Sequence, residues 1–352
     1  MASIRDVAAL AKVSTATASR ALSGRGPVSP ATRERVLRAS AELGFVPSAN
    51  AAGLASGRSR NIGVIVPGVD RWFFAKVVRG ISEELLDQGY DLSLYTTGGS
   101  HDHQEKVLQD YLLRQRLDAV VPVALELTTR ERERLVAIGR PIVGVGGAMP
   151  GTLTVGIDQE AAGALATGHL TGLGHRHIAH LTAGKDPHRD FGLTGTRQGG
   201  FERAMAQAGL VVRPEWVITS DFTLNDAYAR AKALLAAPER PTAVFAASDE
   251  MAVGTILAAR DLGLRVPDDL SVVGIDGHEL GDVVGLTTVA QFPERQGARA
   301  AARLLQQLAH DGAPDEPQHE TVATDFVVRS STAVPPSPGS RSRRSAASPS
   351  PG

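Results

Sequence analysis

The sequence predicts a small all-α unit at the N-terminus, followed by an α/β core of two lobes with parallel sheets. Three observations lead to this fold class. In the first 47 residues, apolar side chains recur three and four positions apart, as in short amphipathic helices. From residue 61 onward, short apolar runs alternate with amphipathic stretches, which is typical of parallel α/β sheets. These strand–helix units outnumber what one sheet usually holds, so we expect two lobes.

The N-terminal unit contains signals for three helices around a tight turn. Ser3–Asp6 has the form of a capping box, and Ser14 can cap a second helix that ends at Ser23. Ser29 and Pro30 are suited to begin a third helix. Two short helices joined by a turn at Lys12–Val13 form a helix-turn-helix pattern. The residues expected to face inward are Ile4, Val7, Ala8, Ala11, Ala18, Ala21, Leu22, Val36, Leu37, Ala39 and Leu43.

The second helix is the expected contact with nucleic acid. Its first turn exposes Ser14, Thr15, Ala16 and Thr17, and Arg20 follows one turn later. Hydroxyls at a helix N-terminus suit phosphates, and exposed early positions of a recognition helix reach base edges in the major groove. A capped surface helix in any small helical unit is the alternative, and the three-helix spacing favours DNA.

Charge is divided unevenly along the chain. Residues 1–60 carry nine Lys or Arg and three Asp or Glu, whereas the remainder carries 28 basic and 35 acidic residues. This asymmetry suggests that the basic end meets a polyanion, although a solvated basic face would give the same count.

The core and its flanks follow in order. Residues 48–60 are small and weakly apolar and predict a linker with marginal helical tendency. The expected strands are Ile62–Val66, Asp91–Thr96, Ala119–Pro122, Ile142–Val145, His177–Leu181, Ala243–Ala246, Leu270–Ile275 and Asp325–Arg329. The expected helices are Lys76–Leu86, Gln104–Leu113, Ala161–Thr171, Gly199–Ala208, Asp226–Leu235, Met251–Leu262 and Gln296–Leu308. Residues 331–352 are rich in Ser, Pro and Arg and are expected to be disordered.

Composition restricts the function classes. The chain has 352 residues, of which 42% are apolar, and it has no cysteine, which excludes disulfides and thiolate metal sites. The N-terminus lacks the pattern of a signal peptide, and no run of 18 apolar residues occurs. We therefore expect a cytoplasmic protein with no membrane contact.

Several segments resemble the lactose-repressor (LacI) family. The similarity extends over about residues 3–330. In the helical unit it lies in Ile4–Ala8, Val13–Ser14, Thr17–Gly24, Val28–Ser29, Thr32–Val36 and Leu43–Pro47. In the core it lies in Ile62–Pro67, Phe73–Phe74, Gly80–Ile81, Ile157–Asp158, Leu173–Ala179, Arg197–Phe201, Ser248–Gly254, Ser271–Asp276 and Leu286–Gln291.

The resemblance implies a domain organisation. Residues 1–47 would be the DNA-binding headpiece and residues 48–60 a hinge helix. Residues 61–330 would form a dimerising core that resembles periplasmic sugar-binding proteins, with an effector in the cleft. Lobe 1 would span about residues 61–159 and 292–320, and lobe 2 about residues 160–291 and 321–330.

The resemblance also implies roles in DNA binding. Thr15, Ala16 and Arg20 would contact bases, and Ser14 and Thr17 would contact phosphates. Leu54, beside Ala51, would be an apolar wedge that enters the minor groove at the centre of the operator. Such a wedge unstacks one base step and permits a bent, more widely contacted duplex.

For the effector, the resemblance points to Arg197 and Asp276, whose side chains suit the bidentate geometry of vicinal hydroxyls. Ser248 is a weaker candidate. Phe74 and Phe222 could stack on a ligand or pack in the core. Asp158 could bind ligand or cap a helix, and Gln291 could serve as a hinge or a ligand contact.

Other chemistries have little support. His169, His175, His177 and His180 lie close in sequence, but residues 177 and 180 fall on opposite faces of the expected strand and no carboxylate or Cys completes a metal site. Gly144–Gly147 departs from a dinucleotide fingerprint. No phosphate-binding loop or nucleophile elbow is present. We expect no catalytic residue, metal or cofactor.

These observations predict a homodimeric, effector-controlled transcription regulator that binds a palindromic operator. The expected role is repression of carbohydrate-utilisation genes in response to a sugar or sugar phosphate. A purine- or nucleoside-responsive regulator of the same family is one alternative. Relatives of that type carry a Trp after the strand that here reads Val143–Gly147, which lacks one. A solute-binding receptor is the other, and the basic headpiece and missing signal peptide disfavour it.

Overall fold

The computed structural model describes residues 2–23, 26–45, 59–112, 117–125, 127–183, 194–310 and 318–336. The chain forms two compact units, Met1–Asn61 with Arg116–Asp118, and the remainder. The expected hinge residues Ala51 and Leu54 lie outside the described residues, as does the tail from residue 337. The disorder expected from residue 331 is wrong for the start of this segment, because Ser331 is buried and its hydroxyl donates to the Val272 carbonyl at 2.6 Å.

The N-terminal unit contains the three expected helices, α1 (Ile4–Leu10), α2 (Thr15–Ser23) and α3 (Pro30–Glu42). The capping box at α1 is present, because the Ser3 hydroxyl accepts from the Asp6 backbone and the Asp6 carboxylate accepts from the Ser3 backbone. Ser29 caps α3 at the backbone of Thr32. The buried cluster consists of Val7, Ala8, Ala11, Ala18, Ala21, Val36 and Ala39.

One inward-facing residue in this unit was predicted wrongly. Leu37 is 50% exposed. The buried stripe of α3 follows Val36, Ala39 and Ser40, with Leu43 packed against the cluster. Leu37 is one position away from this stripe, about 100° around the helix, so it faces away from the cluster.

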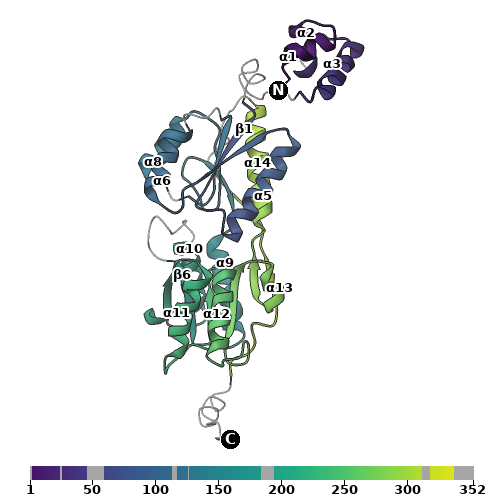
Figure 1. Ribbon diagram of the computed structural model, residues 1–352. Helices are drawn as coiled ribbons and strands as arrows, with labels where there is room; N and C mark the ends of the chain where they lie inside the picture. Colours follow the sequence, from purple (N-terminus) through teal and green to yellow (C-terminus); the bar gives the residue numbers. More distant parts are fainter. Residues whose placement is uncertain are drawn as a thin grey trace. The chain divides into compact units, whose positions relative to one another are not determined.

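Lobe 1 of the core contains two three-stranded sheets in the orders β2-β1-β3 and β11-β5-β4. Isolated bridges from Val120 to Ile142 and from Val123 to Val145 connect β3 with β4, so the two sheets are continuous. The helices α5 and α14 lie side by side along this lobe (Figure 1). The strands are β1 (Asn61–Val66), β2 (Asp91–Thr96), β3 (Ala119–Pro122), β4 (Val143–Val145), β5 (Leu153–Gly156) and β11 (His319–Thr321). The helices are α5 (Trp72–Asp87), α6 (His101–Lys106) with a π-helical turn (Val107–Tyr111), α8 (Thr129–Ala137) and α14 (Pro293–Ala309).

Lobe 2 contains a six-stranded sheet in the order β12-β10-β9-β8-β6-β7, in which only the β10–β12 pairing is antiparallel among the described strands. The strands are β6 (Ile178–Ala183), β7 (Val217–Ser220), β8 (Ala243–Ala246), β9 (Ser271–Asp276), β10 (Thr287–Ala290) and β12 (Asp325–Val327). The helices are α9 (Gln159–Gly172), α10 (Thr194–Gln207), α11 (Leu224–Ala236), α12 (Asp249–Asp261) and α13 (Leu280–Val284), with a 3₁₀ turn at Pro214–Trp216.

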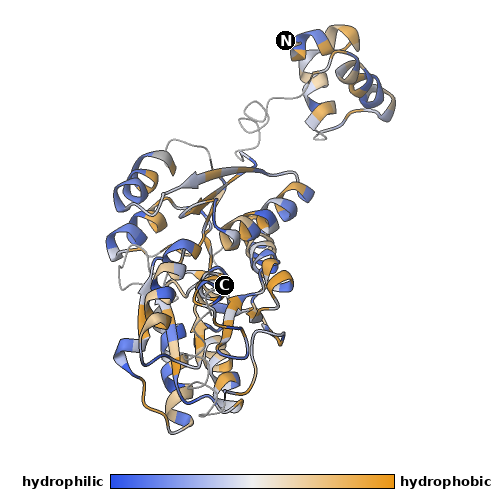
Figure 2. Cartoon of the chain, turned by 60° about the horizontal axis from the view of Figure 1, so that its bottom comes forward, coloured by the Kyte–Doolittle hydropathy of each residue, from blue (hydrophilic) through white to orange (hydrophobic). Residues whose placement is uncertain are grey.

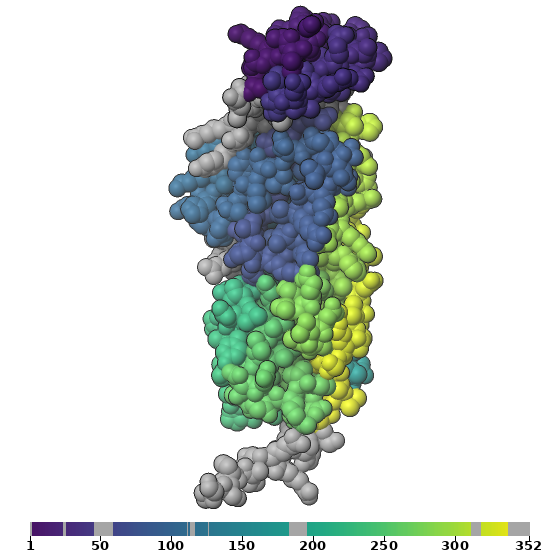
Figure 3. Space-filling model, turned by 45° about the vertical axis from the view of Figure 1, so that its right-hand side comes forward, coloured from purple at the N-terminus to yellow at the C-terminus, as the bar shows by residue number. Residues whose placement is uncertain are grey.

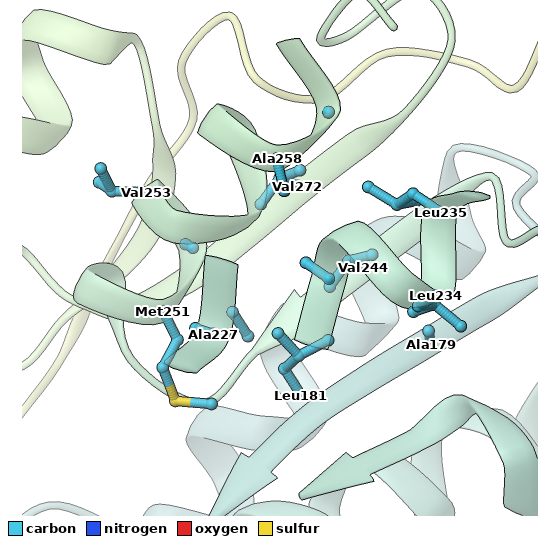
Figure 4. Packing of buried hydrophobic residues seen from close by; sticks show 14 of the residues in the cluster. Ala179, Leu181, Ala227, Leu234, Leu235, Val244, Met251, Val253, Ala258 and Val272 are labelled. Atoms are coloured by element: carbon cyan, nitrogen blue, oxygen red, sulfur yellow. The ribbon is translucent and has the colours of Figure 1, made fainter. Parts of the chain in front are cut away.

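Both faces of the lobe 2 sheet are covered. On one face, α11 and α12 pack on the strands through aliphatic side chains and Met251, as Figure 4 shows for Leu181, Val244 and Met251. On the other face, α9 and α10 cover a cluster that includes Phe201 and Phe245. A parallel sheet buried on both faces explains why these strands are continuous apolar runs in the sequence.

The chain passes between the lobes three times. It leaves lobe 1 after β5, returns after β10 and leaves again after β11, because β11 pairs with β5 and β12 pairs with β10. In Figure 3 the exchange is visible at the surface, where yellow-green residues from the C-terminal part border both the blue lobe and the green lobe. The expected α/β core of two lobes with parallel sheets is confirmed.

Some elements were not predicted. The strands β5, β7, β10 and β11 have three or four residues each, and helices α8 and α13 are also short. Figure 2 shows hydrophobic residues concentrated in the strands and on the helix sides that meet them. Within the described part of the chain, none of the helices combines the length and the apolar character needed to cross a membrane.

Candidate functional site

The N-terminus of α2 has a defined hydroxyl arrangement. The Ser14 hydroxyl accepts from the Thr17 backbone N–H at 3.1 Å and is hydrogen-bonded to the Thr17 hydroxyl at 2.9 Å. Ser14 is therefore the N-cap, as expected. Thr15, Ala16 and Arg20 are exposed, and Arg20 Nε donates to the Ala16 carbonyl at 3.2 Å. The three positions expected to contact bases thus lie on the exposed side of one short helix.

Arg197 is the most deeply buried cation of the candidate effector site, with 1% of the residue exposed. Its Nε donates to Gln159 Oε1 at 2.8 Å, and its Nη1 donates to the Ala247 carbonyl. Its Nη2 is buried and has no hydrogen-bond partner among the described residues. Burial lowers the pKa of Arg197, and the nearby carboxylates of Asp276 and Asp249 oppose this effect.

The contact of Arg197 with Gln159 depends on close packing of α9 and α10. A Cβ on Gly163 would lie 2.3 Å from the Arg197 carbonyl oxygen, and a Cβ on Gly200 would lie 2.1 Å from the Glu160 carbonyl oxygen. The two helix backbones therefore touch at glycines that are reciprocal across the interface. This approach brings the first turn of α9 to the guanidinium.

Asp276 ends β9, at the carboxyl edge of the sheet where ligands of parallel α/β sheets bind. Its Oδ1 accepts from Gln291 Nε2 at 2.5 Å, and its Oδ2 accepts from the Asp249 backbone at 3.2 Å. Burial raises the pKa of Asp276 to about 7, the charge of Asp249 adds to the rise, and Arg197 opposes it.

Asp249 was not predicted as a site residue. Its Oδ1 accepts from the Thr288 hydroxyl at 2.7 Å, and its Oδ2 accepts from the backbones of Gly277 and His278 at 2.9 and 2.8 Å. Burial raises the pKa of Asp249 to about 6, and these hydrogen bonds oppose the rise. The carboxylate ties the segment after Asp276 to the start of α12, so it supports the geometry of the site.

Other candidates have structural contacts of their own. The Ser248 hydroxyl caps α12 at the Met251 backbone, and exposed Asp158 caps α9 at the Ala161 backbone. Phe74 and Phe222 are 6% and 8% exposed and belong to the apolar clusters of lobe 1 and lobe 2. Asp158 is thus a helix cap and the two Phe residues pack in apolar clusters, which are the structural alternatives to a ligand role.

No local sequence signal identifies Gln159 and Asp249, which lie near Arg197 and Asp276 in the structure. Each is marked in the sequence only because it follows a predicted site residue. Gln159 follows Asp158, and Asp249 follows Ser248 in a segment with family resemblance. Gln291, which was weighed as a hinge or a ligand contact, is buried, and its backbone N–H donates to the Asp276 carbonyl at 3.1 Å. Its side-chain Nε2 also donates to Asp276 Oδ1, so the Gln291 side chain lies beside the candidate ligand carboxyl.

The first turn of α5 in lobe 1 contacts lobe 2 beside this site. The Arg71 guanidinium donates to Glu250 and to the Phe222 carbonyl. The Trp72 ring stacks on the His278 ring with centroids 4.7 Å apart, and its Nε1 donates to Glu279. Each partner in lobe 2 is within three residues of Asp249 or Asp276, or is the candidate Phe222 itself.

The clustered histidines have structural environments. His175 is hydrogen-bonded to Thr242, Ser271 and the Ala333 carbonyl. His180 stacks between Phe201 and Phe245, and burial lowers its pKa to about 4. Over the described residues, no group of three His, Asp or Glu side chains could hold a metal ion.

Comparisons with known proteins cover both parts of the chain. Residues 3–48 match the bacterial regulatory proteins, lacI family, and residues 167–332 match a periplasmic binding protein-like domain. The HTH-type transcriptional repressor PurR of Vibrio vulnificus is 35% identical over 94% of this chain and 99% of its own length. PurR of Aliivibrio fischeri is 35% identical over 93% of this chain and 99% of its own length.

Solved structures agree with these sequence matches. The complex of the transcriptional regulator CelR with cellobiose is 31% identical, has a TM-score of 0.69 and covers 94% of this chain and 100% of the other. The lac repressor dimer bound to operator and the anti-inducer ONPF is 26% identical, has a TM-score of 0.82 and covers 94% of this chain and 99% of the other.

Proposed function

The chain belongs to the lacI family of bacterial regulatory proteins and is a DNA-binding transcriptional repressor, and we propose that a neutral sugar bound at Arg197 and Asp276 controls its affinity for DNA. The observation that carries the proposal is the buried Nη2 of Arg197, which has no partner among the described residues. A buried N–H that lacks an acceptor costs free energy, and a sugar hydroxyl would supply one. The Asp276 carboxyl beside it can exchange hydrogen bonds with a second hydroxyl.

The charges around the site favour a neutral ligand. Arg197 is near Asp276 and Asp249, Arg71 is paired with Glu250, and Lys76 is paired with Glu279 at 2.5 Å. Each of these cations therefore already has a carboxyl group nearby. A phosphate group would have to compete with these carboxylates, whereas hydroxyls need no uncompensated cation. We therefore favour an unphosphorylated sugar over a sugar phosphate.

The comparisons support two ligand classes. Cellobiose is bound in the CelR complex. This relative supports a sugar as the effector of the present chain and a role in repressing carbohydrate-utilisation genes. The PurR relatives favour a purine as the second candidate. The segment Val143–Gly147 has no Trp of the kind that purine-responsive relatives carry, which supports the sugar.

We also propose that the repressor binds a palindromic operator as a homodimer. One headpiece reads one half-site, so a two-fold protein suits a palindrome. Exposed apolar residues on lobe 2 supply a surface for the second copy, namely Leu257 of α12 and Leu280, Val283 and Val284 of α13. The relative bound to operator is a dimer, which supports this assembly.

Thermal unfolding of the full chain with separate ligands tests the ligand class. We expect cellobiose or glucose to raise the unfolding temperature, with glucose 6-phosphate, hypoxanthine and guanine as comparisons. A ligand at a hundredfold excess over its Kd stabilises by about 2.7 kcal/mol. Arg197→Met should abolish the shift, whereas Arg203→Met, on the exposed side of the same helix, should keep it. A shift with hypoxanthine or guanine alone would support the purine candidate and contradict the sugar.

A further inference from the structure

Asp118 holds Ser59 and Arg60, the two residues that directly precede β1. It directly precedes β3 and is 5% exposed. Its Oδ1 accepts from the Ser59 backbone at 2.7 Å and from the Ser59 hydroxyl at 2.8 Å, and its Oδ2 accepts from the Arg60 backbone at 2.9 Å. Its own N–H donates to the Asn61 carbonyl at 2.8 Å. Four hydrogen bonds thus connect one residue to three consecutive ones.

The backbone at Arg60 shows that these hydrogen bonds impose a conformation. Arg60 has φ +51, in the left-handed region that residues other than glycine rarely adopt. Such a conformation costs free energy and persists only where its surroundings fix it. Here the Arg60 N–H is bound by a carboxylate, and hydrogen bonds to an ionised acceptor are about twice as strong as neutral ones.

The location of this contact gives it a role beyond local stability. Asn61 begins β1, and Ile62 pairs with Ala119, the residue after Asp118. Residues 116–118 group with residues 1–61 as one compact unit, although they are far away in the sequence. Asp118 therefore lies beside the residues through which the chain enters β1.

We propose that Asp118 is a positioning residue for DNA binding, which fixes the direction in which the chain leaves β1 and so the separation of two headpieces on one operator. This inference rests on the repressor function and the proposed homodimer. A palindromic operator requires both headpieces at a fixed spacing, whereas binding to random duplex does not. Loss of the contact should therefore weaken operator binding much more than non-specific binding.

The test uses the full chain, an operator selected from random-sequence DNA by the unmodified protein, and a scrambled duplex of equal length. We expect Asp118→Asn to weaken operator binding by at least tenfold and scrambled-duplex binding by less than twofold. The Asn amide can still accept from Ser59, but its NH₂ group faces the Arg60 N–H. Ser59→Ala removes one hydrogen bond and should lower the ratio of operator affinity to scrambled-duplex affinity by less than Asp118→Asn does. Ser59→Thr keeps the hydroxyl and should retain the ratio of the unmodified protein.

Glu131→Gln is the matched control. Glu131 is a buried carboxylate of lobe 1 that accepts from the backbone and hydroxyl of Thr128, as Asp118 does from Ser59. The Glu131→Gln variant should leave the ratio of operator affinity to scrambled-duplex affinity unchanged. An unchanged ratio in both Asp118→Asn and Ser59→Ala, or an equal loss on both duplexes, would overturn the inference. Failure of the unmodified chain to select any operator would instead contradict the repressor function.

Discussion

Arg71, at the start of α5 in lobe 1, donates from Nε to Glu250 of α12 in lobe 2 over 2.7 Å. Both side chains are about three-quarters buried. Removal of either partner leaves the other charge partly buried and unpaired, which is more costly than loss of an exposed pair. Arg71→Gln and Glu250→Gln should each lower the free energy of unfolding by about 1–3 kcal/mol, between the values for exposed and fully buried pairs. The double variant should lose less than the sum of the two, with a coupling of about 0.5–2 kcal/mol in urea unfolding. Strictly additive losses would show that the two side chains do not interact in solution.

Arg20 should contribute to recognition of the operator. It is exposed on α2 and one turn after the capped N-terminus. Loss of a bidentate base contact costs about 1–3 kcal/mol, so Arg20→Ala should weaken operator binding by about 5- to 150-fold in gel-shift titrations. Arg38→Ala is the control, because Arg38 lies on α3 and pairs with Glu34 on the same helix. Equal effects of the two variants would argue against a base contact.

The stability of the core should depend on pH through Asp276. Burial raises the pKa of its carboxyl from 3.8 to about 7. Between these values the folded chain holds more protons than the unfolded chain, so this group stabilises most below pH 4 and its contribution is lost as the pH rises toward 7. The slope is on the order of 1 kcal/mol per pH unit. Asp276→Asn should flatten this part of the profile in urea unfolding from pH 5 to 8. An unchanged slope would show that Asp276 is ionised throughout this range.

His180 should act in the opposite direction. Burial lowers its pKa from 6.5 to about 4, so the unfolded chain binds a proton more readily in this range. Its contribution is present above pH 6.5 and is lost as the pH falls toward 4. His180→Leu should make the protein less sensitive to acid, whereas the exposed His103→Leu on α6 should not. Unfolding midpoints at pH 4.5 and 7 compare the two variants, and equal acid sensitivity of both would contradict the prediction.

The proposed dimer surface can be tested at Val283, which is 82% exposed on α13. A charge at the centre of an apolar interface would be left without a partner on association. Val283→Glu should therefore shift the protein toward monomer in analytical ultracentrifugation. Val211→Glu provides a matched control, because Val211 is also highly exposed but does not belong to the proposed surface. Unchanged association of Val283→Glu would place the interface elsewhere.

Much of the fold could be predicted because buried parallel strands are continuous apolar runs. The fully buried segments Ala119–Pro122 and Ala243–Ala246 match the observed strands residue for residue. Asp91–Thr96 also matches its strand, although that strand is partly exposed. In contrast, β10 (Thr287–Ala290) was missed, although it is fully buried. Its Thr288 hydroxyl donates to Asp249, and its Thr287 hydroxyl accepts from the Arg329 backbone. These polar side chains are buried because their partners come from elsewhere in the chain, so composition alone conceals the strand.

The candidate site was only partly predictable for a similar reason. Arg197 and Asp276 were identified by resemblance, and the structure places their charges close enough to affect one another. Gln159 is 38 residues away in sequence from Arg197, and Asp249 is 39 residues away from Thr288. Contacts at such separations are created by the packing of α9 on α10 and by the order of the strands. No local pattern in the sequence encodes them.

The three passages between the lobes also determine which parts of this protein can be exchanged by recombination. Residues 2–45 are a contiguous segment with their own apolar cluster, so one junction could give the same core a different operator preference. Lobe 2 is assembled from separate stretches, with β6–β10 and β12 divided by α14 and β11 of lobe 1. An exchange of one lobe would require several matched junctions at once. Ligand preference should therefore diversify through substitutions within the cleft, whereas operator preference can also be acquired whole from another gene.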